Sequence, residues 1–442
     1  MKRILQALLC LALLSTATAV QAADRISLSD CETAALNYSR RIKALANEVK
    51  SAESAAESAK TATYPSLVLE ANVKYITALP KFFGMEFGDN WNYSAGPALY
   101  WTAFDGNVKR KNYESMEKLA QSKKFELEYE KKQLILNVRQ AYFMLISSLA
   151  TLDLLNQQLA LAQAQNRDVR KGIEHGIKNK LDGVLSDSDV LQRQSQIKSA
   201  QISVTDCIKI LNDLTGNAVS FDFEKYASQN SWKELFDFDS LKDLLDKFLA
   251  YLSASFDENN SSAASLEMMS KYYETLAGAD INSNYPVINI YAKSTMDHPN
   301  GPLVETFNQN TAGASFSMPL YQFGRNKKAA ESGRYSAASY EEQKLEVIEN
   351  MRRLFDSSKK KIAILAAQKD LSADVVDRTK TAAELMFSSY MAGESRFLDV
   401  ENLNVKVLEA KTSEINIYAQ MLTQLAIIAS LSAAALLPEV QQ

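Results

Sequence analysis

Two long proline-free stretches constrain the fold of this chain more than any other feature of its sequence. The eight prolines lie at 65, 80, 97, 286, 299, 302, 319 and 438, which leaves 98–285 and 320–437 without any. Proline breaks the interior of a helix and is tolerated at turns and edge strands. Between Gly324 and Gly393 the only further glycine is Gly333, and a helix of that length would be roughly 100 Å long. A globular domain of ordinary size has no room for such a rod.

Four segments in the proline-containing windows alternate apolar and polar residues, as strands with two different faces do. They lie at about 64–77, 90–104, 285–296 and 310–323. One face carries Leu67, Leu69, Ala71, Val73, Tyr75, Trp91, Tyr93, Ala95, Pro97, Leu99, Trp101, Ile288, Ile290, Ala292, Ala312, Ala314, Phe316 and Met318. Such lengths, with aromatic residues toward the ends, are what a membrane β-barrel requires. A half-buried sheet in a soluble protein alternates in the same way, so the strands alone leave both interpretations open.

The second half of the chain repeats features of the first at an offset of about 217 residues, a period that indicates duplication rather than a solenoid. Tyr64-Pro65 corresponds to Tyr285-Pro286, Gly106 to Gly324, Gly176 to Gly393, and Asp182 to Asp399. We predict a first structural repeat over 23–262 and a second over 263–442. Gly106, Pro319 and Gly324 mark the junctions at which a strand passes into a long helix.

Apolar residues follow these junctions at alternating spacings of three and four, which is typical of coiled coils. The first series is Val138, Tyr142, Leu145, Leu149, Leu152 and Leu159, with Asn156 in the skipped slot; the second is Ile348, Met351, Phe355, Ile362 and Leu365, with Ser358 in the gap. We predict long helices over about 106–216 and 324–437. Each forms an antiparallel hairpin, with its tip near 172–182 or 389–399, at Gly176 or Gly393.

Residues 1–22 have the features of a secretory signal peptide, with Lys2 and Arg3 before an apolar stretch and Ala22 at a small-residue cleavage site. A short membrane anchor is the weaker alternative, because the apolar stretch is too short to span a bilayer. The longest later apolar run, 425–437, is interrupted by two serines and is also too short. We therefore expect an exported protein that does not enter a membrane through helices.

Composition argues against several functions. The formal net charge of −4 gives no basic footprint for nucleic acid. His175 and His298, the two histidines, have no partner motif for metal binding or acid–base catalysis, so we predict no enzyme activity, cofactor or metal site. Cys31 and Cys207 remain after cleavage of the signal peptide. They could pair in an oxidising compartment, but we favour two separate buried residues.

Four strands cannot close a membrane barrel, because such barrels begin at eight strands. Open sheet edges are not tolerated in lipid either. If the strands lie in a membrane, other copies of the chain must therefore complete the barrel.

The sequence resembles the TolC-like outer membrane efflux proteins over nearly the whole mature chain. The most specific marks are Met318-Pro-Leu-Tyr-Gln-Phe-Gly324 entering a helix, and Tyr390-Met-Ala-Gly393 followed by Leu398-Asp399-Val400. The resemblance implies a mainly α fold with a β-barrel part. Long coiled-coil hairpins would form an α-barrel, and four strands per chain would complete a 12-stranded β-barrel in a homotrimer.

The same resemblance implies a channel in the outer membrane whose helical part projects into the periplasm. It would be the exit duct of a tripartite efflux pump or of a type I secretion system, and its sequence does not separate the two. Its partners would be a periplasmic adaptor protein, an inner-membrane transporter and outer-membrane lipid. Residues 217–262, with Trp232, Phe236 and Phe238, would form an equatorial belt around the tunnel.

By the same resemblance, a gate lies at the periplasmic tip. Asp399 falls on an aspartate that narrows the pore. Asn402 falls where a second aspartate is often found, and this departure leaves open a weaker ring of charge or a ring at another position. Tyr390 falls on a tyrosine that holds the tip shut, and Arg396 and Asp182 complete the candidate gate. Aspartate is also favoured at helix N-termini. For Asp182 we rank helix capping ahead of gating, and for Asp399 both roles stay open.

Two other classes of protein deserve comparison. An exported coiled-coil spacer or adhesin would use the helices as a rod and would conduct no ions. A diffusion porin carries all its strands in one chain and has no long helices. The loops at 79–90 and 297–308 would face outside in the channel interpretation, although nothing in them shows a ligand.

Overall fold

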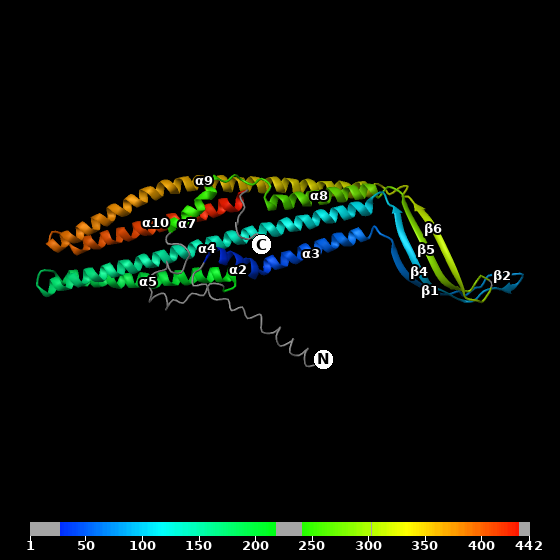
Figure 1. The fold of residues 1–442 in the computed structure, drawn as a ribbon, viewed down its shortest axis with the longest axis horizontal. Helices are drawn as coiled ribbons and strands as arrows, with labels where there is room; N and C mark the ends of the chain where they lie inside the picture. The colour runs from blue at the N-terminus through cyan, green and yellow to red at the C-terminus, as the bar shows by residue number, and fades with distance from the viewer. Residues whose placement is uncertain (1–26, 218–240, 302, 433–442) are drawn as a thin grey trace, which may run out of the picture. The chain divides into compact units, whose positions relative to one another are not determined.

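The structure is a computed structural model that describes residues 27–217, 241–301 and 303–432 (Figure 1). The predicted signal peptide and the three equatorial aromatic residues, Trp232, Phe236 and Phe238, lie outside the described residues. So do residues 433–437, the predicted end of the last helix.

Two helices are as long as the sequence predicts: α4 has 67 residues and α9 has 68. The helices are α2 (Leu28–Tyr38), α3 (Arg40–Thr61), α4 (Val108–Glu174), α5 (Lys180–Thr215), α7 (Leu241–Leu249), η2 (Ala250–Ser253), α8 (Ser261–Asn282), α9 (Arg325–Ala392) and α10 (Phe397–Leu431). The strands are β1 (Ser66–Tyr75), β2 (Lys81–Phe82), β3 (Met85–Glu86), β4 (Trp91–Phe104), β5 (Val287–His298) and β6 (Phe307–Ser317). The order of a 22-residue helix, two strands and a long hairpin occurs in both halves of the chain.

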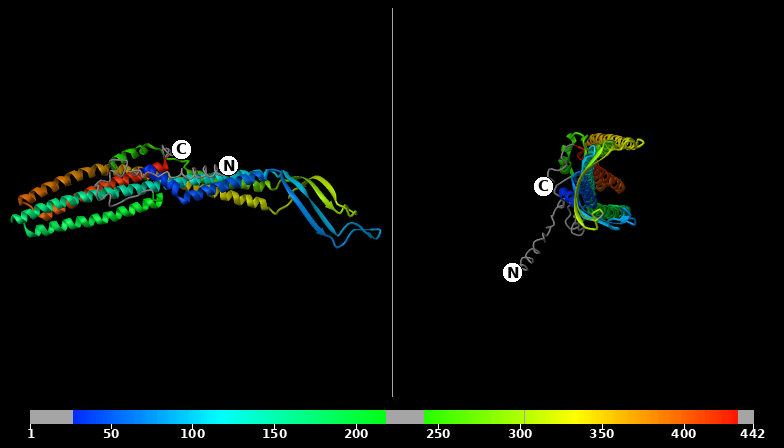
Figure 2. Two further views of the ribbon diagram at one scale, coloured as in Figure 1. Left: turned by 60° about the horizontal axis from the view of Figure 1, so that its bottom comes forward. Right: turned by 90° about the vertical axis from the view of Figure 1, so that its right-hand side faces the viewer.

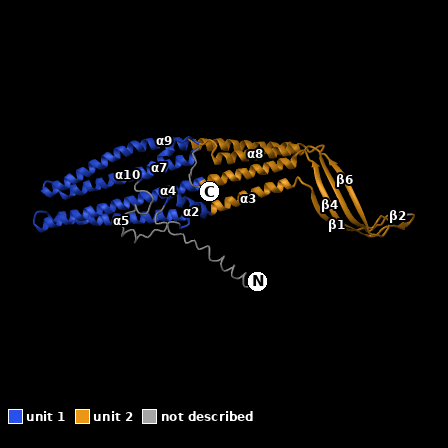
Figure 3. Ribbon diagram, viewed as in Figure 1, with its two compact units in different colours: residues 1–39, 132–256, 353–442 blue, residues 40–131, 257–352 orange. Residues whose placement is uncertain are grey.

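The chain forms two compact units, and each takes segments from both halves (Figure 3). Unit 1 consists of 1–39, 132–256 and 353–442, and unit 2 of 40–131 and 257–352. The units therefore cut across the two predicted sequence repeats. The repeats remain a prediction about the origin of the chain.

Unit 2 contains an antiparallel four-stranded sheet in the order β1-β4-β5-β6, which curves in the views of Figure 2. The register places apolar residues opposite one another: Leu67 faces Leu99, Val73 faces Tyr93, and Ile290 faces Ala314. These side chains point away from any core, and Leu67 is 72% exposed. An exposed apolar face of this extent marks a surface that interacts with a membrane or with another protein.

The opposite face of the sheet is polar. The Tyr100 hydroxyl donates to Glu70, whose other carboxylate oxygen accepts from Lys293 at 2.9 Å. Thr102 donates to the side chain of Asn289 at 2.9 Å. The alternation read from the sequence thus separates a polar and an apolar face, as in the strands of a membrane barrel.

The strand ends differ from the prediction. The fourth strand was expected to reach residue 323, but β6 ends at Ser317. Pro319 cannot donate to a strand ladder, and Gly324 adopts a left-handed φ of 78° just before α9. Residues 318–322 are therefore irregular, and Phe323 and Gly324 form a turn. Gly106 takes the same conformation, with φ of 68°, before α4. The predicted loop at 79–90 also contains a short hairpin, β2–β3.

Unit 1 contains α5 and α10 with the parts of α4 and α9 that follow residues 131 and 352, and so both hairpin tips. On α4, the first predicted series of apolar residues is buried from Val138 to Leu149. On α9, Phe355, Ile362 and Leu365 of the second predicted series are buried. Further along α4, Leu152 and Leu159 are half-buried and pack against a core cluster of Leu154, Leu155, Ile197 and Leu408. The buried line there runs through Leu155, Gln158, Ala162, Gln165 and Val169. A straight helix drifts relative to a repeat of 3.5 residues, so one fixed series cannot stay buried over such a length.

Both mature cysteines, Cys31 and Cys207, are buried, as we favoured. Within the described residues, α4 is the one helix with a stretch long and apolar enough to cross a membrane. More than half of that stretch is buried inside the structure, as in the core helix of a soluble protein.

Candidate functional site

The two hairpin tips of unit 1 turn at glycines with left-handed backbones. Gly176, just after α4, has φ of 74°, and Gly393, just after α9, has φ of 86°. Residues with a Cβ are strained in this conformation, whereas glycine is not. Both turns fall within the ranges expected for the tips.

Tyr390 lies at the centre of a small core that joins the two hairpins. Its side chain is 1% exposed and packs with Val169 of α4 and with Phe397 and Val400 of α10. The rings of Tyr390 and Phe397 meet edge to face, with centroids 5.4 Å apart. The sequence singled out this tyrosine, and the structure places it where the tips of the two hairpins meet.

The Tyr390 hydroxyl reaches from α9 to α5 and donates a hydrogen bond to Asp182 Oδ2 at 3.3 Å. Burial raises the pKa of Tyr390 above its ordinary value, and the charge and hydrogen bond of Asp182 raise it further. The phenol therefore remains a donor across the whole neutral and moderately alkaline range. This bond is a direct polar link between the two hairpins.

Lys178 reinforces the same contact from the loop between α4 and α5. Its ammonium group donates to the backbone carbonyl of Tyr390 and lies 3.9 Å from the centroid of the Tyr390 ring. A cation over an aromatic face adds ~0.5–2 kcal/mol, depending on solvent exposure. Lys178 also approaches the carbonyl of Met391, at 3.5 Å.

Asp182 does not supply the helix cap that we ranked first for it. The side chain of Asn179 is the cap of α5, because it accepts from the backbone N–H of Leu181 at 3.1 Å. Asp182 lies in the first turn of α5, where the helix dipole stabilises a negative charge. Its carboxylate is thus available to Tyr390.

Asp399 is the N3 residue of a capping box at the start of α10, where Arg396 is the N-cap. Its carboxylate accepts from the backbone N–H of Arg396 at 3.4 Å and from the guanidinium at 3.3 Å. Asn402, nearly one turn further along α10, is exposed. Arg396 and Asp399 therefore form one local unit at the start of α10, separate from the Tyr390–Asp182 bond.

A buried amide pair lies behind the tip. Asn404 of α10 donates to Gln165 Oε1 of α4 at 2.9 Å, and both side chains are buried. Buried polar groups are costly when unpaired, so this bond favours one register between the helices. The sequence analysis missed it.

A second missed feature is a buried ion pair on α5. The Arg193 Nε lies 3.1 Å from Asp189 Oδ1, and both side chains are at most 3% exposed. Burial raises the pKa of Asp189, and Arg193 opposes that rise. Glu401 of α10 also has a raised pKa, first because of burial and then because of the Asp189 charge, again opposed by Arg193.

Replacing Glu401 with glutamine should stabilise the protein at neutral pH. A folded-state pKa above the ordinary value of 4.5 means that Glu401 contributes most below that pH and loses this contribution as the pH rises through the folded-state pKa. The midpoint of thermal unfolding of Glu401→Gln should rise at pH 7, and its difference from the wild type should shrink toward pH 4. Glu409→Gln, at an exposed position on the same helix, is the control. A lower midpoint for Glu401→Gln at pH 7 would contradict this reading.

The tip thus holds polar bonds and an aromatic core. In the part of the chain that the structure describes, no group of three or more His, Cys, Asp or Glu residues could hold a metal ion. His175 is exposed at the tip. What the geometry does is hold the two hairpins together.

A family model described as outer membrane efflux protein matches residues 33–217 and 262–434. A search of curated proteins by sequence gave no match.

Several solved structures share the fold of the chain. They include VceC of Vibrio cholerae (TM-score 0.73, 14% identity, 91% of this chain and 95% of that one) and the CmeC channel of Campylobacter jejuni (TM-score 0.72, 14% identity, 91% and 85%). The MtrE channel of Neisseria gonorrhoeae, in an open state, matches with a TM-score of 0.70 at 13% identity. The match covers 91% of this chain and 88% of that one.

Proposed function

This chain belongs to the outer membrane efflux protein family, and from that membership we propose that it is a passive exit duct, closed at rest by the contacts between its hairpin tips. Its place is the outer membrane, with the helical part in the periplasm. It acts as an efflux channel. The observation that carries the finer proposal is a chain that combines a two-faced sheet, with an exposed apolar face, and long helical hairpins.

The duct is a homotrimer in this proposal. One chain supplies four strands in the sheet β1-β4-β5-β6, with β1 and β6 as free edges. Exposed edges are not tolerated in lipid, and only a closed barrel removes them. Three copies give twelve strands, with the apolar face toward lipid and the Glu70–Lys293 face toward water.

The partners are an adaptor protein in the periplasm and an energised transporter in the inner membrane. The duct has no chemistry of its own, so energy and choice of cargo come from these partners. Tripartite drug efflux and type I secretion both fit this arrangement. Opening is a separation of the α9–α10 hairpin from α4–α5, which breaks the Tyr390–Asp182 bond.

A test of this proposal is the state of the mature protein in cells. It should fractionate with the outer membrane and, after gentle extraction in detergent, have the mass of three chains by light scattering. A monomer in the soluble periplasmic fraction would support the alternative of an exported spacer or adhesin.

Asp399 offers a second prediction, because its two candidate roles can be separated. In the proposed pore, three copies of this carboxylate around a narrow axis attract cations and repel anions. Asp399→Asn retains an oxygen that can cap α10 but removes the charge, whereas Asp399→Ala removes both. If Asp399 lines the constriction, both variants should lower cation selectivity, measured as the reversal potential in a salt gradient. Unchanged selectivity with lower thermal stability in Asp399→Ala alone would leave capping as its role.

A further inference from the structure

A polar pocket lies at the end of the four-stranded sheet that is remote from the helices. It has a volume of about 350 Å³, which is toward the lower end of the range of ~300–1,000 Å³ for small-ligand pockets. All four strands contribute to it, and every residue in its lining belongs to unit 2. Its lining includes Asn72, Asn92, Ser94, Asp297, Phe307 and Gln309. We call this cavity the mouth pocket.

The mouth pocket lies on the polar face of the sheet. Asn72 follows Glu70 by two residues in β1, so the two share one face, because side chains alternate along a strand. Asp297 follows Lys293 by four residues in β5 and shares that face too. The register places Ser94 opposite both Asn72 and Asp297. In the proposed duct this face meets water inside the barrel, and this end of the sheet faces the outside of the cell.

Several polar groups in the mouth pocket have no partner in the described part of the chain. Asp297 Oδ1 is buried and has no hydrogen-bond partner among the described residues. The side chains of Asn72, Ser94 and Gln309 also make no hydrogen bond within the described residues. Buried polar groups in proteins are nearly always paired, because an unpaired one has lost its hydrogen bonds with water. The mouth pocket therefore offers hydrogen bonds to a molecule from outside the chain.

We propose that the mouth pocket binds a neutral sugar of one or two rings. The amides in its lining, those of Asn72, Asn92 and Gln309, both donate and accept hydrogen bonds, and the Asp297 carboxylate accepts them. Each hydroxyl group of a sugar also donates and accepts, so neighbouring hydroxyls on one ring can pair with a single amide or carboxylate. The Phe307 ring supplies an apolar surface for the C–H face of the sugar.

The charges in the lining favour a neutral ligand. Lys74 also lines the mouth pocket, and its ammonium group balances the carboxylate of Asp297. The carboxylate repels an anionic ligand and the ammonium group repels a cationic one, whereas a sugar hydroxyl can bond to either group. The inference rests on the proposed function, which places the mouth pocket at the cell surface.

His298 holds the loops around the mouth pocket in place. Its Nε2 lies 3.2 Å from Asp89 Oδ2 in the loop that precedes β4, and its Nδ1 lies 3.4 Å from Thr306 Oγ1 in the loop that precedes β6. Its ring stacks on that of Tyr93, with centroids 4.6 Å apart. Because these walls are fixed before binding, less conformational freedom is lost when a ligand arrives.

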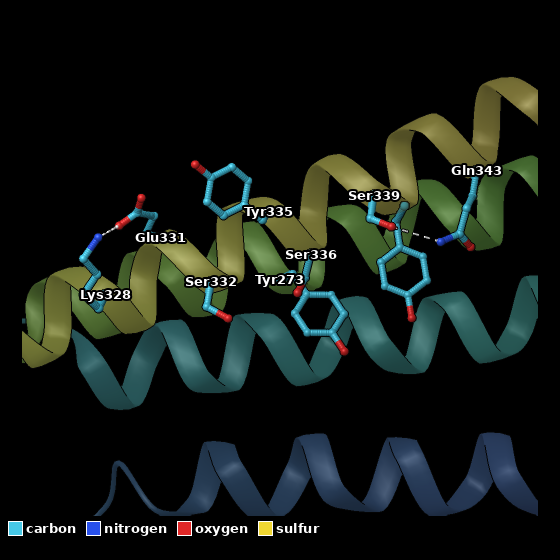
Figure 4. A pocket seen from close by; sticks show the side chains of 9 residues that line it. Tyr273, Lys328, Glu331, Ser332, Tyr335, Ser336, Ser339 and Gln343 are labelled. Atoms are coloured by element: carbon cyan, nitrogen blue, oxygen red, sulfur yellow. Dashed lines mark hydrogen bonds and ion pairs between the residues drawn. The ribbon is translucent and has the colours of Figure 1, made fainter.

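A larger groove along α9, with a volume of about 660 Å³, is a poorer ligand site (Figure 4). Its polar side chains pair with one another along the helix. Lys328 forms an ion pair with Glu331 at 2.6 Å, and Gln343 donates to Ser339 at 3.2 Å. A ligand in this groove would have to compete with these contacts, whereas the polar groups of the mouth pocket are unpaired.

Saturation-transfer NMR tests the sugar site on the full mature protein, purified in a detergent without a sugar head group. The probes are glucose, galactose, maltose and lactose. We expect saturation to pass from the protein to at least one of them, and titration then gives its dissociation constant. Asn72→Ala and Gln309→Ala, both at exposed positions, should each raise that constant at least threefold. Asp297→Ala should raise it at least tenfold.

A competition arm identifies the source of the sugar. Lipopolysaccharide with its core sugars, added in the same detergent, should displace the probe if the mouth pocket takes the sugar groups of outer-membrane lipid. A probe that stays bound indicates free sugars from solution. Either result supports the sugar site and decides between its two sources.

Asn308→Ala is the matched control, because Asn308 is the neighbouring exposed amide on β6 and points to the opposite face of the sheet. Its dissociation constant should equal that of the wild type. No saturation transfer from folded protein to any of the four sugars, or the same constant in Gln309→Ala as in Asn308→Ala, would overturn the sugar site. The current in a planar bilayer tests the duct separately, so a conducting protein that binds none of the sugars would refute the sugar site alone.

Discussion

Tyr390→Phe should raise the fraction of time for which the pore is open at least tenfold. The variant keeps the ring that packs on Phe397 but removes the hydroxyl that donates to Asp182. A hydrogen bond to a charged group contributes ~1.5–3 kcal/mol, and its length of 3.3 Å places this one at the lower end. About 1.4 kcal/mol corresponds to a tenfold change in an equilibrium constant, and the trimer contains three such bonds.

Single-channel recording of wild type and variant at the same voltage and salt measures this effect. Tyr38→Phe is the matched control, because Tyr38 of α2 is 49% exposed and lies outside the tip core. Asp182→Ala should have an effect of the same sign as Tyr390→Phe, and the double variant should add little to either. An open fraction in Tyr390→Phe equal to that of the wild type would show that the bond does not hold the pore closed.

Glu32→Ala should produce a large loss of stability, because it breaks a buried ion pair. Glu32 of α2 and Arg139 of α4 form an ion pair of 2.6 Å, and their side chains are 3% and 5% exposed. The guanidinium also lies 5.6 Å from the ring centroid of Phe248 in α7. Removing one partner of a buried ion pair costs about 3–5 kcal/mol.

Denaturant unfolding followed by helical circular dichroism measures that loss. Glu48→Ala breaks an exposed pair with Lys123 and should cost less than about 1 kcal/mol. Glu32→Leu combined with Arg139→Met removes both buried charges and should recover most of the stability lost in Glu32→Ala. Equal losses for Glu32→Ala and Glu48→Ala would contradict a structural role for the buried pair.

Glu32 makes the free energy of unfolding depend on pH, and its contribution falls as the pH rises. Burial raises its pKa above the ordinary value of 4.5, and Arg139 only partly opposes that rise. Ionised Glu32 is therefore less favourable than its neutral form relative to the unfolded chain. Its contribution to stability is complete below pH 4.5 and falls as the pH rises through the folded-state pKa.

The long elements of the fold were predictable from the sequence because a few residues determine them. The absence of proline over 98–285 and 320–437 specifies the long helices, and period-two alternation specifies the strands. Gly176 and Gly393 specify the tips, since each occupies a left-handed turn. The end of β6 was predicted too late in the sequence. The alternation of apolar and polar residues does not show where a single proline or glycine, here Pro319 and Gly324, ends a strand.

The candidate site was predictable only in part. Tyr390 was recognised from its motif, and its position at the contact follows from that motif. Lys178 and the Gln165–Asn404 pair were missed because their partners are more than 200 residues away in the sequence. Gln165 does leave a signal: it continues the spacing of three and four from Leu155 through Gln158 and Ala162, and a polar residue on a buried line implies a polar partner.

The central claim is that three copies of this chain form a duct closed at the hairpin tips. Its most direct test is the single-channel current of the purified mature protein in a planar bilayer. We expect small, steady currents that favour cations and increase in Tyr390→Phe. No current from protein shown to be folded and inserted would contradict the duct and favour an exported coiled-coil spacer.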